Sequence, residues 1–270
     1  MYVARVAIPG QLLGEGQDDR VAYGVVHGLD ARGIPTPDAT VDILTSHPFG
    51  ELKSTGAVLP LGAVRVLAPV LPSKIVCVGK NYADHAKEMG GAVPAEPVIF
   101  IKPNTAVIGP NDAITMPWQS ERVDHEAELA IVIGRTARNV RRDDARQYIL
   151  GYTLANDVTA RDLQQRDGQW TRAKGFDSFC PLGPWIVSDF EPADQAITCT
   201  LDGEVRQSST LDHMERDCFE IIEFISHVMT LIPGDVILTG TPGGIGPMKD
   251  GQTVTVAVEG LGALTNPLRA

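Results

Sequence analysis

The sequence contains few cysteines and no long hydrophobic run. Its four cysteines are spread over 270 residues and form no Cys-x-x-Cys pair, which argues against a disulfide framework and against a zinc site. No apolar run approaches the roughly 18 residues that suggest a membrane-spanning helix. The N-terminal residues lack a basic segment followed by an apolar one, so no signal peptide is predicted. We therefore expect a cytoplasmic protein whose cysteines act as small buried hydrophobic residues.

Positive charge is also scarce. The formal net charge is −11 at pH 7, with 34 Asp and Glu residues against 23 Lys and Arg residues. Such a field repels nucleic acids and anionic membrane surfaces, so neither is an expected partner. An anionic substrate would have to meet a locally positive site, formed by a metal ion or by a few basic side chains.

The hydrophobic pattern predicts an α+β fold that is mostly β. Short apolar runs typical of strands occur at residues 74–79, 98–102, 129–134 and 148–156. Asp202-Gly203 suits the tight turn of a β-hairpin. A helical stripe, with Asp217 as its candidate N-cap, has apolar residues at positions 221, 222, 225, 228 and 229.

A change of pattern near residue 70 suggests two domains. The first part consists of short strand-like pieces divided by turn formers, and more regular patterning begins after Pro69 and Pro72. We predict a small β-rich N-terminal domain over residues 1–70 and a larger domain over residues 71–270.

Two carboxylates, Glu126 and Glu128, precede a strongly apolar run. In a strand, residues two apart share a face, so both side chains are expected to project together. Neighbouring carboxylates repel each other unless a cation lies between them, and Mg²⁺ or Mn²⁺ suits oxygen ligands of this kind. Taken alone, the pair also fits a solvated strand edge.

Asp157 ends a predicted strand and precedes a helix-like stretch. It is either the N-cap of that helix or a third carboxylate for the same cation. Arg161 and Gln164 lie four and seven residues further on, which would place the three on one helical face. Arg suits a substrate carboxylate because its planar guanidinium matches the carboxylate geometry.

His85 and Glu88 lie three apart in a short predicted helix. A carboxylate beside an imidazole raises its basicity and orients it, as general-base catalysis requires. The alternative is an incidental ion pair on an exposed helix.

Two loop segments add further candidates. Lys174, in a loop with interleaved aromatic and basic residues, is a candidate for stabilising an enolate, or else a surface lysine. The glycine-rich segment 238–247 contains Thr241 and matches neither the dinucleotide nor the phosphate-loop pattern. Its amides and threonine hydroxyls suit a small anion, unless it is a tight loop without a ligand.

Taken together, these segments resemble the fumarylacetoacetate hydrolase (FAH) superfamily, in particular its short bacterial, acylpyruvase-like branch. The resemblance runs from about residue 74 to residue 267 and is carried, in this order, by VGKNYADHAKEM, DHEAELAIVIG, NDVTARDLQ, GQWTRAKGFDSFCPLGPWI and TGTPGGIG. It implies a catalytic domain built as an FAH-type mixed β-roll, in a homodimer.

The resemblance also implies roles for individual residues. The implied ligands of Mg²⁺ or Mn²⁺ are Glu126, Glu128 and Asp157. The implied catalytic residues, a water-positioning pair on a lid and a lysine beside the metal, are His85, Glu88 and Lys174. The implied lining of the substrate pocket is Arg161, Gln164 and Thr241.

The implied substrate is a small anionic 2-oxo or enol acid. We hypothesise that the metal stabilises the enolate that forms when the neighbouring C–C bond breaks. Attack by water would hydrolyse an acylpyruvate or fumarylpyruvate-like compound, and loss of CO₂ would decarboxylate oxaloacetate. Movement of a proton would instead isomerise a 2-hydroxyhepta-2,4-diene-1,7-dioate. The residues do not choose among these reactions. Two alternatives remain: a binding protein without turnover, against which Lys174 and the His85/Glu88 pair argue, and a purely structural β-protein, which predicts no thermal shift on addition of Mg²⁺ or Mn²⁺.

Overall fold

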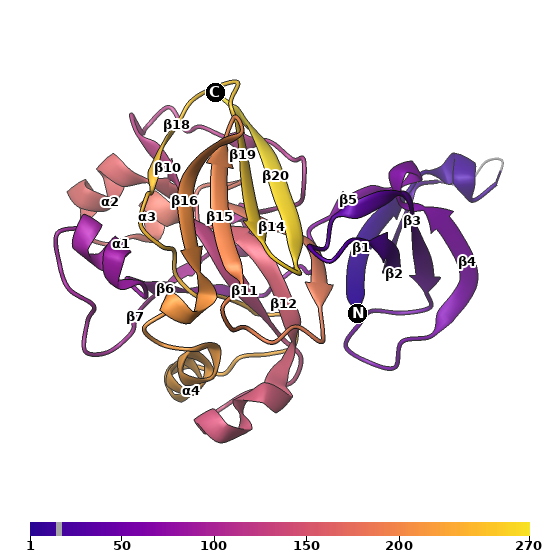
Figure 1. Ribbon diagram of the computed structural model, residues 1–270, viewed down its shortest axis with the longest axis horizontal. Helices are drawn as coiled ribbons and strands as arrows, with labels where there is room; N and C mark the ends of the chain where they lie inside the picture. Colours follow the sequence, from indigo (N-terminus) through magenta and orange to yellow (C-terminus); the bar gives the residue numbers. More distant parts are fainter. Residues whose placement is uncertain (15–17) are drawn as a thin grey trace.

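The computed structural model describes residues 1–14 and 18–270. Its N-terminal part is β-rich and projects from the larger body of the molecule (Figure 1). It comprises β1 (Tyr2–Ile8), η1 (Gly10–Leu12), β2 (Arg20–Leu29), β3 (Pro35–Leu44), β4 (Ser54–Pro60), η2 (Leu61–Ala63) and β5 (Arg65–Leu67). Strand β1 pairs with Val187 and Ile186 of a strand in the larger body. The sheet is therefore continuous across the two parts, and the boundary at residue 70 stays a prediction.

A twelve-stranded sheet is the largest sheet of the molecule, and its main strand order is β4-β3-β2-β1-β14-β12-β11-β17-β6-β7. Beyond the N-terminal part it contains β6 (Ile75–Gly79), β7 (Val98–Lys102), β8 (Val107–Ile108), β11 (Ala127–Ile133), β12 (Ile149–Asn156), β14 (Cys180–Val187) and β17 (Val236–Leu238). The predicted apolar runs at 74–79, 98–102, 129–134 and 148–156 correspond to β6, β7, β11 and β12, with ends shifted by one or two residues. Strand β7 ends the main order, so one of its edges pairs with no other strand of the described residues.

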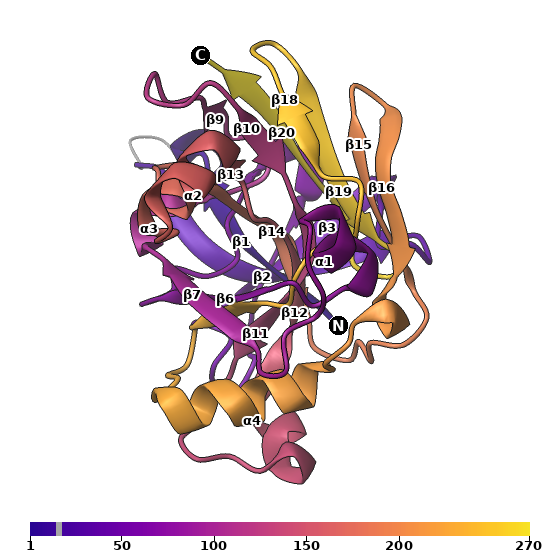
Figure 2. The ribbon, with the colours of Figure 1, turned by 90° about the vertical axis from the view of Figure 1, so that its left-hand side faces the viewer.

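Two smaller sheets complete the β structure (Figures 1 and 2). A five-stranded sheet has the order β16 (Glu204–Thr210), β15 (Ala196–Leu201), β19 (Thr253–Val258), β20 (Gly262–Arg269) and β9 (Ile114–Thr115). A three-stranded sheet has the order β13 (Thr159–Ala160), β10 (Val123–His125) and β18 (Gly246–Met248). The Asp202-Gly203 turn joins β15 and β16 as predicted, and both residues have positive φ.

Strand β11 lies at the centre of the packing. Leu129 and Ile131 on one face pack in the same buried cluster as Val254 and Val256 of β19. The opposite face, which includes Val132, belongs to a second buried cluster. Burial of both faces explains why this strand is a continuous apolar run.

The helices lie around the sheets (Figure 2). They are α1 (Ala83–Glu88), η3 (Asn104–Ala106), η4 (Arg142–Tyr148), α2 (Arg161–Asp167), α3 (Thr171–Lys174), η5 (Leu211–His213) and α4 (Cys218–Val228). The predicted N-cap of α4 is confirmed, because the Asp217 carboxylate accepts hydrogen bonds from the amides of Phe219 and Glu220. The apolar face predicted for this helix is not buried at its C-terminal end, where Val228 is 57% exposed. Within the described residues, no helix is both long and apolar enough to cross a membrane.

Candidate active site

Three carboxylates that the sequence places in two separate segments meet at one point. One oxygen from each of Glu126, Glu128 and Asp157 lies within 4.8 Å of the other two, and all three side chains are buried. The register of β11 on β12 brings them together, because Ala127 faces Asn156 and the Asp157 amide donates to the Glu126 carbonyl over 2.9 Å. Glu126 and Glu128 project to the same point as predicted, although Glu126 lies in the break between β10 and β11 and not within a strand.

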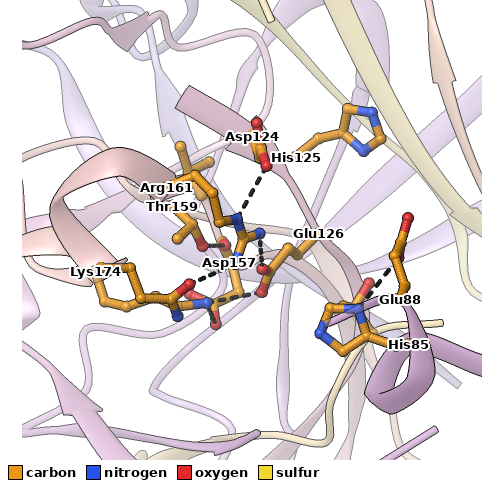
Figure 3. A network of polar contacts seen from close by, with 12 residues as sticks. His85, Glu88, Asp124, His125, Glu126, Asp157, Thr159, Arg161 and Lys174 are labelled. Atoms are coloured by element: carbon orange, nitrogen blue, oxygen red, sulfur yellow. Dashed lines mark hydrogen bonds and ion pairs between the residues drawn. The ribbon is translucent and has the colours of Figure 1, made fainter. Parts of the chain in front are cut away.

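Basic side chains contact two of the carboxylates, Glu126 and Asp157 (Figure 3). The Lys174 ammonium lies 2.7 Å from Glu126 and 2.5 Å from Asp157. Arg161 donates to Glu126 and, over 2.9 Å, to Asp124. These basic side chains offset part of the negative charge of the carboxylates, which an anionic substrate requires in a protein of net charge −11.

The charges within the triad are unevenly compensated. Burial raises the pKa of Glu126, but Lys174 and Arg161 outweigh burial and the net pKa lies below its ordinary value. In contrast, burial and the charges of Asp157 and Glu126 raise the pKa of Glu128 well above its ordinary value. Among the described residues, Glu128 finds no cation within hydrogen-bonding distance. Its carboxylate accepts from the Gly240 amide over 2.6 Å.

This arrangement fits a divalent metal ion. The donor set is three buried carboxylates, the oxygen ligands that Mg²⁺ and Mn²⁺ prefer. Burial and the negative charges of Asp157 and Glu126 together raise the pKa of Glu128 at the point where the three side chains meet. A cation bound there would offset that charge, so the residues present suit the ion that the sequence resemblance implies.

Asp157 is not a helix N-cap. Helix α2 begins at Arg161 and is preceded by Ala160, which makes no side-chain capping bond. The single helical face predicted for Asp157, Arg161 and Gln164 is therefore wrong, because β13 separates Asp157 from the helix. Arg161 and Gln164 do share a face of α2, and the guanidinium donates to the side-chain amide oxygen Oε1 of Gln164 over 2.6 Å.

Lys174 ends the short helix α3 instead of lying in a loop. Burial lowers the pKa of its ammonium, but Asp157 and Glu126 outweigh burial and the net pKa is raised. The side chain is 2% exposed, so the alternative of a surface lysine is wrong.

His85 and Glu88 face each other on α1. His85 Nδ1 lies 3.5 Å from Glu88 Oε2, which is an ion-pair distance that is long for a hydrogen bond. His85 is buried and lines the same cavity as the triad, so α1 is not the exposed helix of the alternative interpretation.

The glycine-rich segment holds protein carboxylates. Besides Gly240, which donates to Glu128, the Gly243 amide donates to Asp84 and the Gly244 amide to Glu88. The segment therefore attaches α1 to the carboxylate site, and these amides are occupied by the protein's own anions. Thr241 accepts a hydrogen bond from Gln207 over 2.7 Å and lines the cavity.

Sequence reasoning missed three residues that support the site. Lys102 on β7 is fully buried and donates to Asp157, Asp124 anchors Arg161, and Gln207 links Thr241 to the amide of Ala127. A lysine that closes the apolar run VIFIK was a visible signal for Lys102. Asp124 lies in the same segment as Glu126, whereas no pattern in the sequence marks Gln207.

The chain matches two family models. The model described as "Fumarylacetoacetate (FAA) hydrolase C-terminal" matches residues 74–269, and one described as "Rv2993c-like, N-terminal" matches residues 16–69. The first covers more than half of the chain. The chain belongs to the fumarylacetoacetate hydrolase family.

Similar proteins agree with this assignment. Protein Rv2993c of Mycobacterium tuberculosis is 52% identical over 99% of this chain and 98% of its own length. The crystal structure of a 5-carboxymethyl-2-hydroxymuconate delta-isomerase from Mycobacterium smegmatis has a TM-score of 0.89 and 49% identity, covering 100% of this chain and 99% of that one. A fumarylpyruvate hydrolase from Pseudomonas aeruginosa, solved in complex with Mn²⁺ and pyruvate, has a TM-score of 0.71 and 34% identity, covering 76% of this chain and 91% of that one. The FAH-type fold is thus confirmed.

Proposed function

We propose that this FAH-family chain is a Mg²⁺- or Mn²⁺-dependent hydrolase. It would cleave the C–C bond next to a carbonyl in a small 2-oxo or enol acid of the acylpyruvate type. The observation that carries the proposal is the convergence of Glu126, Glu128 and Asp157 in a buried site that Lys174 and His85 also line. The P. aeruginosa relative described with Mn²⁺ and pyruvate supports both the ion and the class of product.

The three carboxylates would hold the metal, and the chain's basic residues would hold the substrate near it. A bound divalent ion supplies Lewis-acid stabilisation of the negative charge that develops on a 2-oxo acid. Lys174 adds a fixed positive charge inside the same buried site, where electrostatic interactions are stronger than in water. Gln164 and Thr241 line the cavity beside these groups and would orient the substrate.

The His85/Glu88 pair would activate water. His85 accepts a proton from a water molecule, which attacks the distal carbonyl of the acylpyruvate, while Glu88 stabilises the imidazolium. The C–C bond then breaks, and its electron pair leaves on the methylene carbon as the enolate of pyruvate. Protonation of that carbon completes the reaction, which yields pyruvate and the carboxylic acid of the acyl group.

Isomerisation is the second candidate, and decarboxylation of oxaloacetate the third. The same His85/Glu88 pair can move a proton within an unsaturated 2-hydroxy acid without attacking it with water. The M. smegmatis neighbour described as an isomerase favours this alternative over decarboxylation.

A substrate panel tests the proposal. Acetylpyruvate, oxaloacetate and a 2-hydroxy-dienedioate are incubated with the protein in Mn²⁺ or Mg²⁺ and, separately, in EDTA. Hydrolysis predicts metal-dependent release of pyruvate and acetate from acetylpyruvate. Disappearance of the dienedioate without release of pyruvate from any acylpyruvate would instead favour the isomerase.

We also propose that the chain forms a homodimer, as the family resemblance implies. Light scattering after gel filtration should give twice the 28.9 kDa of one chain. A mass of one chain at micromolar concentration would contradict the proposal.

A further inference from the structure

A large groove runs along the open edge of β7, the last strand in the main order of the large sheet. Its volume is about 710 Å³, and it is lined by residues 98–101 of β7, residues 168–171, Pro103, Gly175 and Met229. By comparison, the chamber that contains the carboxylates has a volume of about 30 Å³. A volume of this size holds about one water molecule, so the tail of a longer substrate must extend outside the chamber.

The groove and the chamber share two walls. Phe100 and Trp170 line both, and their rings meet edge to face with centroids 5.1 Å apart. The Lys174 ammonium lies 5.0 Å from the centroid of the Phe100 ring. The aromatic pair therefore stands between the groove and the lysine of the active site.

Gly79 allows Trp170 to take this position. A Cβ at Gly79 would lie 3.0 Å and 3.2 Å from two atoms of the indole ring, closer than nearly all real Cβ contacts. Val98, which faces Gly79 across the β6–β7 ladder, is the groove residue next to this contact.

The two spaces differ in charge. The chamber is lined by acidic and basic side chains, whereas none of the described side chains that line the groove is ionisable. The mainly apolar lining favours hydrocarbon, because contact removes apolar surface from water, whereas no described side chain that lines the groove can form an ion pair with a carboxylate.

We propose that this groove binds the uncharged, apolar acyl tail of the substrate, and that Phe100 and Trp170 form the passage through which the tail leaves the chamber. The inference rests on the proposed function, which places the 2-oxo acid head at the carboxylate site. It specifies the substrate class as 2-oxo acids with extended hydrocarbon tails. Acids with a second, distal carboxylate would be disfavoured.

A ligand series tests the groove without requiring turnover. Binding of pyruvate, 2-oxobutanoate, 2-oxohexanoate and 2-oxooctanoate to the Mn²⁺-loaded protein is measured by calorimetry. We expect the affinity to rise about two- to four-fold for each added methylene. The matched dicarboxylate 2-oxoadipate should bind at least ten-fold more weakly than 2-oxohexanoate. Equal affinities along the series would overturn the proposal, as would tighter binding of 2-oxoadipate, which would point to Lys80 in the chamber wall.

A charge placed in the groove provides the second test. Val98→Lys adds a cation at the end of the passage, and should raise the affinity for 2-oxoadipate relative to 2-oxohexanoate by at least ten-fold. The matched control is Val58→Lys on β4, where Val58 is 57% exposed and far from the groove in the sheet order. The control should leave the ratio of the two affinities unchanged. A Val98→Lys protein that melts like the wild type and keeps the wild-type ratio would contradict the assignment.

The outcomes separate this inference from the proposed hydrolase. If acetylpyruvate is hydrolysed but the ligand series is flat, the groove assignment fails and the hydrolase stands. If the series rises as expected but no acylpyruvate is cleaved, the groove stands and the hydrolase fails.

Discussion

The ammonium of Lys102 lies 2.5 Å from Oδ1 of Asp157, and both side chains are almost completely buried. The same ammonium donates to the carbonyl of Val158 over 3.1 Å. Lys102 thus fixes one oxygen of Asp157, while Lys174 contacts the other. A side chain from the edge strand β7 therefore positions a carboxylate that we assign to the metal.

Removal of Lys102 should destabilise the protein most when no metal is bound. Lys102→Met leaves the Asp157 carboxylate with less compensation in a buried site, and loss of one partner from a buried ion pair typically costs about 3–5 kcal/mol. We expect this loss in urea unfolding with EDTA and a smaller loss with Mn²⁺, because a bound cation also compensates Asp157.

The matched control for Lys102→Met is Lys74→Met. Lys74 pairs with the buried Asp235, which is not among the carboxylates of the site. Its destabilisation should be the same in EDTA and in Mn²⁺. Equal losses for Lys102→Met under the two conditions would argue that Asp157 is not a metal ligand.

Substitution of Glu128 should separate metal binding from folding. Glu128→Gln keeps an oxygen that can accept from Gly240 and removes a charge that Asp157 and Glu126 repel. In EDTA the variant should melt at the same temperature as the wild type or higher. Its affinity for Mn²⁺ should fall by about 100-fold or more. Loss of a residue that only hydrogen-bonds to a metal ligand typically lowers metal affinity by about 10- to 100-fold, so a larger loss indicates a ligand.

Thermal melting with and without Mn²⁺ measures both effects of Glu128→Gln. The wild-type midpoint should rise with Mn²⁺ concentration, and that of the variant should stay constant over the same range. A variant that retains the wild-type shift would exclude Glu128 as a ligand.

His85 should matter for hydrolysis far more than for decarboxylation. We expect His85→Ala to lower kcat for acetylpyruvate by about 10²- to 10⁴-fold, the usual contribution of a general base, because hydrolysis needs an activated water. Loss of CO₂ from oxaloacetate needs no such water and should fall much less.

Steady-state assays of both reactions in the same preparation measure the difference. His227→Ala, which alters an exposed histidine on α4, is the matched control and should change neither rate. Equal losses in both reactions would show that His85 shapes the cavity and does not activate water.

The stability of the protein should decline in alkali through its buried thiols. Burial raises the pKa of Cys199 and of Cys218 to about 12, whereas an unfolded thiol has a pKa of about 8.5. Below about pH 8 both thiols are protonated in both states, so they have no effect on stability there. As the pH rises above that value, the unfolded chain loses its protons first. Each thiol then lowers the free energy of unfolding by about 1.4 kcal/mol per pH unit.

Urea unfolding at pH 8, 9 and 10 measures this dependence. Cys199→Ala removes one of these thiols. The free energy of unfolding of the variant should therefore fall less steeply with pH, by about 1.4 kcal/mol per pH unit. If the variant and the wild type lose stability at the same rate, Cys199 is not protected in the folded state.

Residue types and spacing predicted much of the fold and the candidate side chains of the site. Apolar runs of five to nine residues located the central strands, since burial on both faces of a strand requires continuous hydrophobic sequence. The Asp202-Gly203 turn and the Asp217 cap were predictable because each depends on a local backbone conformation. The position of Glu126, Glu128 and Asp157 beside such strands made them candidates, and the family resemblance assigned all three to one cation.

Only the tertiary structure decided which basic side chain offsets the charge of each carboxylate in the site. The pairing of β11 with β12 sets Asp157 beside Glu126, and the position of β7 brings Lys102 to Asp157 across 55 residues of chain. Such contacts depend on strand order and register, which no local pattern encodes. The sequence therefore determined which side chains were available for the site, whereas long-range pairing decided which of them are buried against each other and what charge each retains.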